Sequence, residues 1–322
     1  MNKNMTALVS CFARCYHTKS SIVKIYNDEL AGKLLSKQEY DGIAANMAGI
    51  SFFNPGYSGD NPLEWIVNNQ LAPSVLARSA FNERHLNNEI RLGLCQYVIM
   101  ASGYDTSGYM VNDMVKVFEL DMPEMIEDKI MRVEAAGIDS SNVSYVGCDF
   151  NGSWIDKLLD AEFDAGCKTY CSLMGISYYL SKETFGDTVR ILAEHMPQGS
   201  CIAFDYTDIS RSRNKEINKE LAKAADETMQ AEYSLDDIEA IADNAGLLIY
   251  ENSDCSELDD MYFANYNLMN KGHEITAPQG TCCCLLVKKQ PGCLKLFSMP
   301  IRNKLSVFPW AKISVHLTWP TR

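Results

Sequence analysis

A short stretch of the chain, Val98-Ile99-Met100-Ala101-Ser102-Gly103-Tyr104-Asp105-Thr106, decides the fold. Its apolar beginning predicts a buried β-strand, and its small and polar end predicts a turn that opens a helix. In an open α/β sheet, the crevice beyond the carboxyl end of such a strand is where a nucleotide-like ligand binds. Gly103 would let backbone and ligand approach closely. A dinucleotide-binding loop needs three glycines, so this single glycine disfavours a nicotinamide cofactor.

Apolar runs of the same kind recur along the chain and alternate with helical patterns, which is typical of βαβ units on a mainly parallel sheet. Pro123 predicts a helix start, and Ser181 and Ser234 are predicted N-caps. The fold class is therefore α/β and Rossmann-like, a seven-stranded and mostly parallel sheet with helices on both faces. The predicted strands are 96–100, 116–120, 143–146, 169–173, 201–206, 247–251 and 281–287.

The pattern changes at about residue 90. Residues 1–90 carry helical patterns and are predicted to form a helical N-terminal cap. Residues 91–289 are predicted to form the Rossmann-like domain, with insertions near 207–232 and 253–280. Residues 290–322 hold no acid and several basic residues, which indicates a basic C-terminal extension to which we assign no function.

Composition excludes several classes of protein. The chain has 322 residues and a net charge of -13, which argues against a nucleic-acid partner because phosphate binding needs clustered Lys and Arg. The twelve cysteines fall mostly in apolar runs and are interpreted as reduced core thiols. No Cys pair has the two-residue spacing of a zinc site, so we predict no metal. No apolar run reaches the roughly 18 residues of a membrane span, so we expect no membrane partner and a cytoplasmic location.

A carboxylate follows the second predicted strand. Glu119 lies at its end, at a distance after Gly103 near that at which an acid meets ribose hydroxyls in nucleotide-binding sheets. A carboxylate can accept two hydrogen bonds from a vicinal diol. Glu119 is therefore the predicted ribose ligand, and the alternative is a solvated acid at the end of a strand.

Several motifs occur together in an order and spacing that resembles the leucine carboxyl methyltransferase family. The resemblance covers about residues 5–288. The motifs are Arg78-Ser79, Gln96-Tyr97-Val98-Ile99 with Ser102-Gly103-Tyr104-Asp105-Thr106, Phe118-Glu119-Leu120-Asp121-Met122-Pro123 followed by Lys129, Asp149-Phe150 with Trp154, and Tyr179-Leu180.

The resemblance implies a class I methyltransferase fold and S-adenosyl-L-methionine as the cofactor, with methylation of a carboxyl or hydroxyl group of a small molecule. Arg78 would pair with the carboxylate of the methionine moiety, and Lys19 would assist there. Glu119 would hold the ribose, and Asp149 with Phe150 would flank the adenine. The implied cofactor-binding residues are Lys19, Arg78, Ser102, Gly103, Asp105, Glu119, Leu120, Asp149 and Phe150.

Three positions depart from the family pattern, and one is Ser107, because the family commonly has Asp-Thr-Arg where this chain has Asp105-Thr106-Ser107. Met174-Gly175 stands where the family commonly has Glu-Gly, and Ala101 stands where it commonly has glycine. The loss of that acid keeps an alternative open, a non-catalytic protein that binds a nucleoside or S-adenosylmethionine on the same fold.

The catalytic residues are not identified by the sequence. Methyl transfer from a sulfonium needs alignment, and a hydroxyl acceptor also needs a base, whereas a carboxylate does not. His17 and His195 are candidate bases, although a lone histidine is more often structural. Tyr178 and Tyr179 could form an aromatic wall around the sulfonium, and core packing explains them as well. The oligomeric state stays open. An apolar or aromatic acceptor is predicted from the insertion near 253–280, which carries Met261, Tyr262, Phe263, Tyr266 and Met269.

Overall fold

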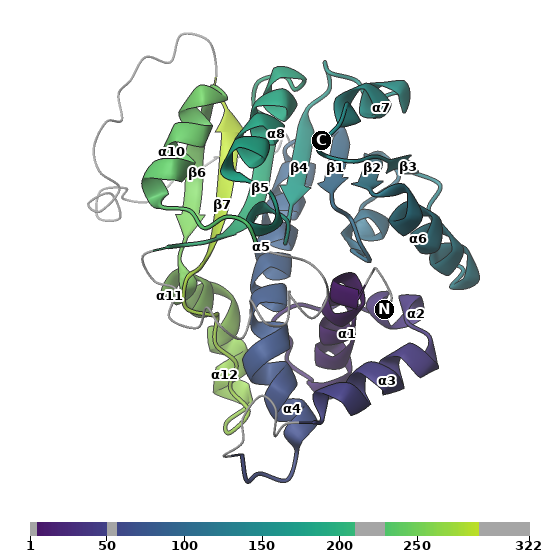
Figure 1. The fold of residues 1–322 in the computed structure, drawn as a ribbon, viewed down its shortest axis with the longest axis vertical. Helices are drawn as coiled ribbons and strands as arrows, with labels where there is room; N and C mark the ends of the chain where they lie inside the picture. Colours follow the sequence, from purple (N-terminus) through teal and green to yellow (C-terminus); the bar gives the residue numbers. More distant parts are fainter. Residues whose placement is uncertain (1–4, 50–56, 210–228, 290–322) are drawn as a thin grey trace, which may run out of the picture. The chain divides into compact units, whose positions relative to one another are not determined.

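A seven-stranded sheet in the order β3-β2-β1-β4-β5-β7-β6 organises the chain (Figure 1). This computed structural model describes residues 5–49, 57–209 and 229–289. β7 runs antiparallel to its neighbours β5 and β6, and the other pairs are parallel. All seven predicted strands are present, and the predicted fold class is confirmed. The strands are β1 (Gln96–Met100), β2 (Lys116–Asp121), β3 (Val143–Gly147), β4 (Thr169–Leu173), β5 (Cys201–Thr207), β6 (Leu247–Ser253) and β7 (Thr281–Lys288).

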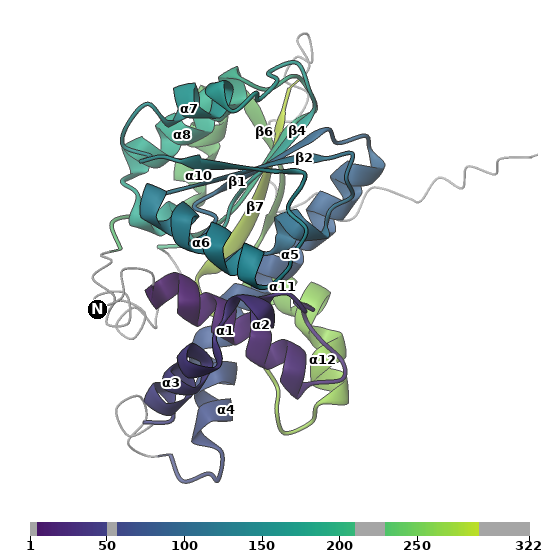
Figure 2. The ribbon, with the colours of Figure 1, turned by 90° about the vertical axis from the view of Figure 1, so that its right-hand side faces the viewer.

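Helices cover both faces of the sheet, as Figure 2 shows. The central strands are buried on both faces, which explains why they read as unbroken apolar runs. The predicted caps are confirmed, since the Ser181 side chain accepts the Thr184 N–H and the Ser234 side chain accepts the Asp237 N–H. The covering helices are α5 (Ala72–Arg91) and α6 (Pro123–Ala135) on one face, and α7 (Trp154–Asp160), α8 (Lys182–Glu194) and α10 (Leu235–Asn244) on the other.

The residues before β1 are helical, as predicted. They form α1 (Met5–Ser20), α2 (Ala31–Leu34), α3 (Lys37–Met47), α4 (Pro62–Ile66) and a π-helical turn, Val67–Leu71, that continues into α5. The start of α3 is marked by a capping box of Ser36 and Glu39. These helices gather at one end of the sheet with α11 (Cys255–Leu258), the π-helical Asp259–Phe263 and α12 (Ala264–Met269) (Figures 1 and 2).

One predicted helix is wrong. The turn after β1 leads only into a 3-10 turn, Ser107–Met110, and not into an α-helix. The Asp105 carboxylate accepts both the N–H and the hydroxyl of Ser107, at 2.6 Å each, which forms a tight local turn. Gly108 then lies flat on β2, because a Cβ there would approach the Val117 side chain to 2.9 Å. The chain therefore returns directly to β2.

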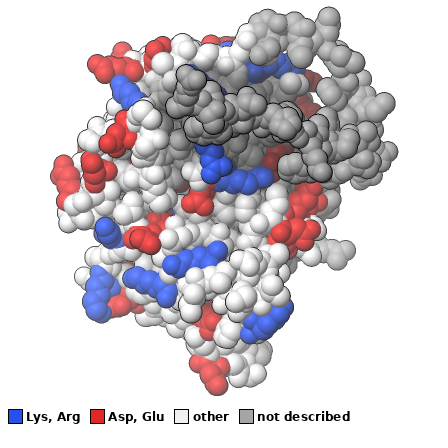
Figure 3. Space-filling view, turned by 180° about the vertical axis from the view of Figure 1, so that it is seen from behind, with Lys and Arg blue, Asp and Glu red and all other residues white. Residues whose placement is uncertain are grey.

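The described residues, up to Lys289, pack as one unit. The predicted C-terminal extension, 290–322, and most of the insertion near 207–232 lie outside the described residues. No helix in the described ranges is long and apolar enough to cross a membrane. On the face drawn in Figure 3, acidic and basic side chains are interspersed over the described surface.

Candidate active site

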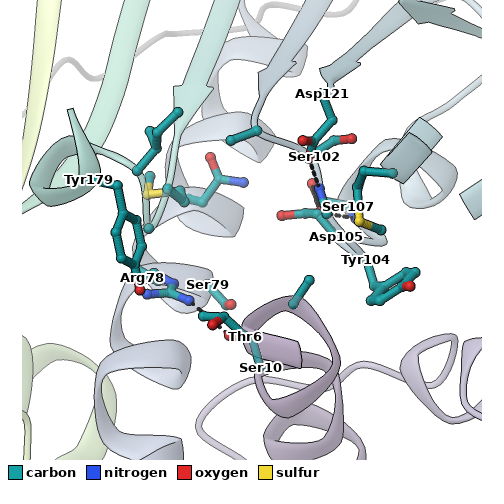
Figure 4. Close-up of a pocket in the computed structure, with 18 of the residues that line it drawn as sticks. Thr6, Ser10, Arg78, Ser79, Ser102, Tyr104, Asp105, Ser107, Asp121 and Tyr179 are labelled. Carbon is teal, nitrogen blue, oxygen red and sulfur yellow. Dashed lines mark hydrogen bonds between the residues drawn. The ribbon is translucent and has the colours of Figure 1, made fainter. Parts of the chain in front are cut away.

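A cavity of about 460 Å³ lies beyond the carboxyl ends of β1, β2 and β4. Its walls come from segments far apart in the chain: α1, α5, the loop after β1, the end of β2 and the loop after β4. Figure 4 shows Arg78 and Tyr179 on one side, and Ser102, Asp105 and Asp121 on the other. This is the crevice that the strand pattern predicts for a nucleotide-like ligand.

The loop after β1 has an unusual backbone that brings main-chain atoms to the cavity. Ala101 and Gly103 have positive φ values of 51° and 43°. Glycine adopts this conformation readily, and alanine adopts it at a cost, so the structure explains why glycine suits position 101. The Ser102 N–H is held by the Leu120 carbonyl at 3.0 Å, which fixes the loop against β2.

Asp121, the last residue of β2, fixes the same loop from the other strand. Its carboxylate accepts the Gly103 N–H at 2.7 Å and the Met122 N–H at 2.7 Å. Burial raises the pKa of Asp121, and these two hydrogen bonds oppose the rise. The carboxylate lines the cavity and keeps lone pairs for further donors. Asp121 can therefore receive hydroxyl groups of a ligand.

Ser102 supplies a polar atom that the protein itself does not satisfy. Ser102 is 2% exposed, it lines the cavity, and its Oγ has no hydrogen-bond partner among the described residues. A buried hydroxyl without a partner costs free energy, so a polar ligand is the natural partner for this group. The residues of this side fit the adenosyl part of S-adenosylmethionine.

The opposite side of the cavity is built around Arg78 of α5. Its Nη1 donates to the Tyr178 hydroxyl at 3.1 Å, and its Nη2 donates to the Ser10 hydroxyl at 3.4 Å. The carboxylate of Asp205 lies 3.7 Å from Nη1. The guanidinium is mostly buried and still lines the cavity, so an anionic group of a ligand could pair with it.

The placement of Glu119 corrects a prediction. Glu119 is fully buried, forms an ion pair of 2.6 Å with Lys129 and accepts from the Tyr109 hydroxyl at 3.2 Å. It is not on the lining of the cavity. Side chains two apart on a strand share a face, and Asp121 is the one at the sheet edge. Of the two acids of β2, Asp121 is the one that lines the crevice.

Other predicted cofactor residues also lie away from the lining. Lys19 is exposed, with its ammonium 4.8 Å from the Tyr40 ring centre. Leu120 is buried in the core on the other face of the sheet. Asp149 is exposed and accepts the Asn151 N–H at 2.9 Å. Phe150 packs against the core, where its ring meets Trp154 edge-on at 6.4 Å.

The predicted catalytic candidates separate into two groups. Tyr178 and Tyr179 line the cavity, whereas His17 is buried elsewhere, where its Nε2 accepts the Ile25 N–H at 2.9 Å. Burial lowers the pKa of His17 to about 4, so it is neutral and structural. His195 is also off the lining, and its Nδ1 lies 2.8 Å from the Ile191 carbonyl oxygen. The prediction of His17 as a base is corrected.

The insertion near 253–280, which was expected to shape the acceptor site, lies away from the cavity lining. No residue of the insertion 253–280 is on the described lining. Phe263 and Tyr266 are buried in the core instead. Residues of the N-terminal cap line the cavity instead, among them Thr6, Ser10 and Tyr26. The aromatic character of the insertion therefore serves packing, because its rings fill the space beside the cap.

Three side chains at the cavity were not predicted: Asp121 and Arg14, which line it, and Asp205, which lies beside Arg78. Arg14 donates to Asp28 at 2.8 Å and to the Tyr104 carbonyl at 2.6 Å, which ties the cap to the loop after β1. For Asp121 a signal existed, because it directly precedes Met122 and the helix-starting Pro123. Within the described residues, no group of three or more potential metal ligands gathers.

Comparison with known families and proteins gives one consistent result. Residues 7–193 match the model of the leucine carboxyl methyltransferase family. A protein of Bacillus subtilis (strain 168), named "Putative S-adenosyl-L-methionine-dependent methyltransferase YktD", is 34% identical over 286 residues, which are 82% of this chain and 94% of that protein. A protein of Mycolicibacterium gilvum (strain PYR-GCK), with the same name apart from the final symbol, is 28% identical over 54% of this chain and 61% of its own length.

Solved structures share the fold. A DUF574 family protein of Streptomyces avermitilis MA-4680 superposes with a TM-score of 0.55 at 15% identity, over 87% of this chain and 97% of that one. A protein of Thermobifida fusca YX, described as a "putative methyltransferase", gives a TM-score of 0.51 at 15% identity, over 88% and 94% of the two chains. At this identity, the likeness concerns the architecture alone.

Proposed function

The chain belongs to the leucine carboxyl methyltransferase family, and from that premise we propose that it methylates an oxygen atom of a small molecule. It is a methyltransferase that depends on S-adenosylmethionine. The observation that carries the proposal is the cavity itself, which has a cationic side chain at one side and a carboxylate at the other (Figure 4). The donor has the complementary groups, a carboxylate at one end and ribose hydroxyls toward the other.

The described residues have distinct roles in this proposal. Asp121 receives the ribose hydroxyls, Arg78 pairs with the methionine carboxylate, and Ser102 and Gly103 contact the region between them. When bound, the donor would supply a methyl group on a positively charged sulfur. The acceptor oxygen would bond to the methyl carbon in line as the carbon–sulfur bond breaks, and S-adenosylhomocysteine would leave. The protein contributes alignment of the reacting groups and exclusion of water from the nucleophile.

The chemistry of the lining favours an acceptor oxygen that is already ionised. The acids of the described lining are Asp105 and Asp121, and both have oxygens engaged in hydrogen bonds that shape the loop. Burial raises the pKa of Tyr26 well above its usual range, so this tyrosine is a poor base. A carboxylate acceptor needs no base, whereas a hydroxyl acceptor does. Carboxyl methylation is therefore the first reaction to test, and hydroxyl methylation the second.

The acceptor is proposed to be apolar or aromatic apart from its reacting group. Support comes from the side chains around Arg78, since Met174, Ile176 and Tyr179 line the cavity there. Binding sites of this kind recognise ligands by apolar contact and orient them by a few polar groups. The net charge of -13 further supports a partner other than nucleic acid, and the buried thiols support a cytoplasmic location.

Calorimetry with S-adenosylhomocysteine, followed by methyl-transfer assays with a labelled donor, tests this function. The expected result is saturable binding at one site and transfer to apolar carboxylic acids in a panel that also contains phenols. Transfer to nitrogen or sulfur acceptors alone would contradict the proposal. Binding without transfer to any acceptor would favour the non-catalytic binding protein, for which Met174 in place of the family's acid is the supporting feature.

A further inference from the structure

A buried acid lies directly behind the Arg78 side of the cavity. Asp205 is on β5 between the core residues Phe204 and Tyr206, and its side chain is only 3% exposed. A carboxylate in an apolar strand is unfavourable unless charged or polar groups compensate its desolvation. The groups that contact the Asp205 carboxylate therefore indicate its role.

The two oxygens of Asp205 contact two different parts of the site. Oδ1 accepts the Gly175 N–H at 2.5 Å, and Oδ2 lies 3.7 Å from Nη1 of Arg78. Gly175 has a φ of 78°, and a Cβ there would lie 3.0 Å from Cζ of Arg78. The guanidinium thus packs against the Gly175 backbone, and one carboxylate holds both the loop after β4 and the guanidinium.

The charged and polar groups around Arg78 bear on the role of its ion pair with Asp205. The acids of the described lining, Asp105 and Asp121, are on the opposite side of the cavity from Arg78 (Figure 4). Tyr178 and Tyr179 also face Arg78, and Arg14 is a nearby like charge. Asp205 approaches from the core, while the guanidinium also lines the cavity, where an anion could pair with it beside Ser10 and Tyr178.

We propose that Asp205 is a positioning residue, which holds Arg78 in the orientation that receives the carboxylate of the methionine moiety. This inference rests on the proposed function, because it assigns that carboxylate to Arg78. An Arg side chain has many rotamers, and fixing it in advance reduces the ordering that binding would otherwise require. Asp205 does not touch the donor in this account.

Two ligands that differ at one end test the inference. S-Adenosylhomocysteine carries the amino-acid carboxylate, whereas 5′-methylthioadenosine lacks the whole amino-acid end and keeps the adenosyl part. Calorimetry would measure both affinities for the full chain and for Asp205→Asn, which keeps the size of the side chain. We expect the affinity for S-adenosylhomocysteine to fall roughly 10-fold, while that for 5′-methylthioadenosine changes by less than about twofold. In an Arg78→Ala background, Asp205→Asn should have little further effect.

Tyr206→Phe is the matched control. It changes the next residue of β5, which faces the opposite side of the sheet, and removes a hydrogen bond of 3.0 Å to Asn252. Both affinities should stay unchanged. Gly175→Ala is the second test, needed if Asp205→Asn does not fold, because its Cβ would displace the guanidinium and leave the carboxylate in place. It should also weaken S-adenosylhomocysteine selectively.

Each contrary outcome has a distinct meaning. Equal losses for both ligands in Asp205→Asn, or no loss for either, would overturn the positioning role. If Arg78→Ala does not weaken S-adenosylhomocysteine selectively, the pair has no part in binding the amino-acid end. If the unmodified chain binds neither ligand, the proposed function itself fails, and the inference fails with it.

Discussion

The two sides of the cavity are built in different ways. The Asp121 side comes from segments close in sequence, and its geometry depends on main-chain hydrogen bonds to Ser102, Gly103 and Met122. The Arg78 side depends on side chains that meet only in the folded protein, from α5, the loop after β4 and β5. The first side should be sensitive to any change in the Asp121 carboxylate, which accepts the backbone N–H groups of Gly103 and Met122. The second side should be sensitive to changes in the ion pair of Arg78 and Asp205, two residues that are far apart in the sequence.

The largest expected effect is that of Asp121→Asn. The amide replaces one of two acceptors that hold backbone N–H groups, and it also weakens the proposed bonds to ribose. We expect a loss of roughly 300-fold in affinity, about 3.4 kcal/mol, from hydrogen bonds to a charged group. Calorimetry should find this loss for S-adenosylhomocysteine and 5′-methylthioadenosine alike, because both carry the ribose. A loss of affinity for S-adenosylhomocysteine alone would contradict the assignment of Asp121 to the ribose.

Glu119→Gln sharpens the comparison within β2. At pH 8, the substitution leaves the buried Lys129 ammonium without its ionic partner, so the free energy of unfolding should fall by about 3 kcal/mol. Ligand affinity of the folded variant should be unchanged. Denaturant unfolding measures the first effect and calorimetry the second. Glu119→Gln with Lys129→Met should recover most of the stability, and a large loss of affinity in the single variant would return Glu119 to the binding site.

His17→Gln separates the cap from the chemistry by pH. Burial lowers the pKa of His17 to about 4 in the native protein, whereas its pKa in the unfolded chain is about 6.5. Between these two pH values the unfolded chain is protonated at His17 and the native protein is not. Stability therefore falls as pH decreases from 6.5 to 4, by about 2 kcal/mol for this group after allowance for partial solvation. Glutamine keeps an acceptor for the Ile25 N–H and should remove this part of the decline. A shift in the pH dependence of methyl transfer would instead point to a catalytic His17.

The smallest expected effect belongs to Ala101→Gly. Position 101 has a φ of 51°, which costs an alanine more than a glycine. The free energy of unfolding of the variant should be higher by about 1 kcal/mol from relief of this backbone strain. The greater conformational entropy of glycine in the unfolded chain offsets part of that gain. Thermal unfolding measures this, and ligand affinity should change little. A marked destabilisation would mean that the Ala101 methyl group packs usefully at the loop.

The sheet could be predicted from the sequence because its central strands are buried on both faces. An apolar run such as Val98 to Met100 is favourable only when it is buried, as in the centre of a sheet. The serine caps at 181 and 234 mark helix starts by local hydrogen bonding alone. The helix expected after β1 failed for the same kind of local reason. The Asp105 side chain binds Ser107 and forms a compact turn there.

The site was harder to predict, because strand periodicity does not show where the sheet edge lies. Glu119 and Asp121 share a face, and only the fold shows that Lys129 pairs with the first while the second reaches the crevice. The pairing of Arg78 with Asp205 joins distant segments and has no local signal. Long-range ion pairs of this kind require the tertiary structure.

A crystal structure of the chain with S-adenosylhomocysteine tests the central claim most directly. We predict that the ligand lies in the cavity beyond β1, β2 and β4, with the ribose hydroxyls in hydrogen-bond contact with Asp121 and the amino-acid carboxylate on Arg78. A ligand bound elsewhere, or a ribose held by a different acid while Asp121 contacts only the backbone, would contradict it.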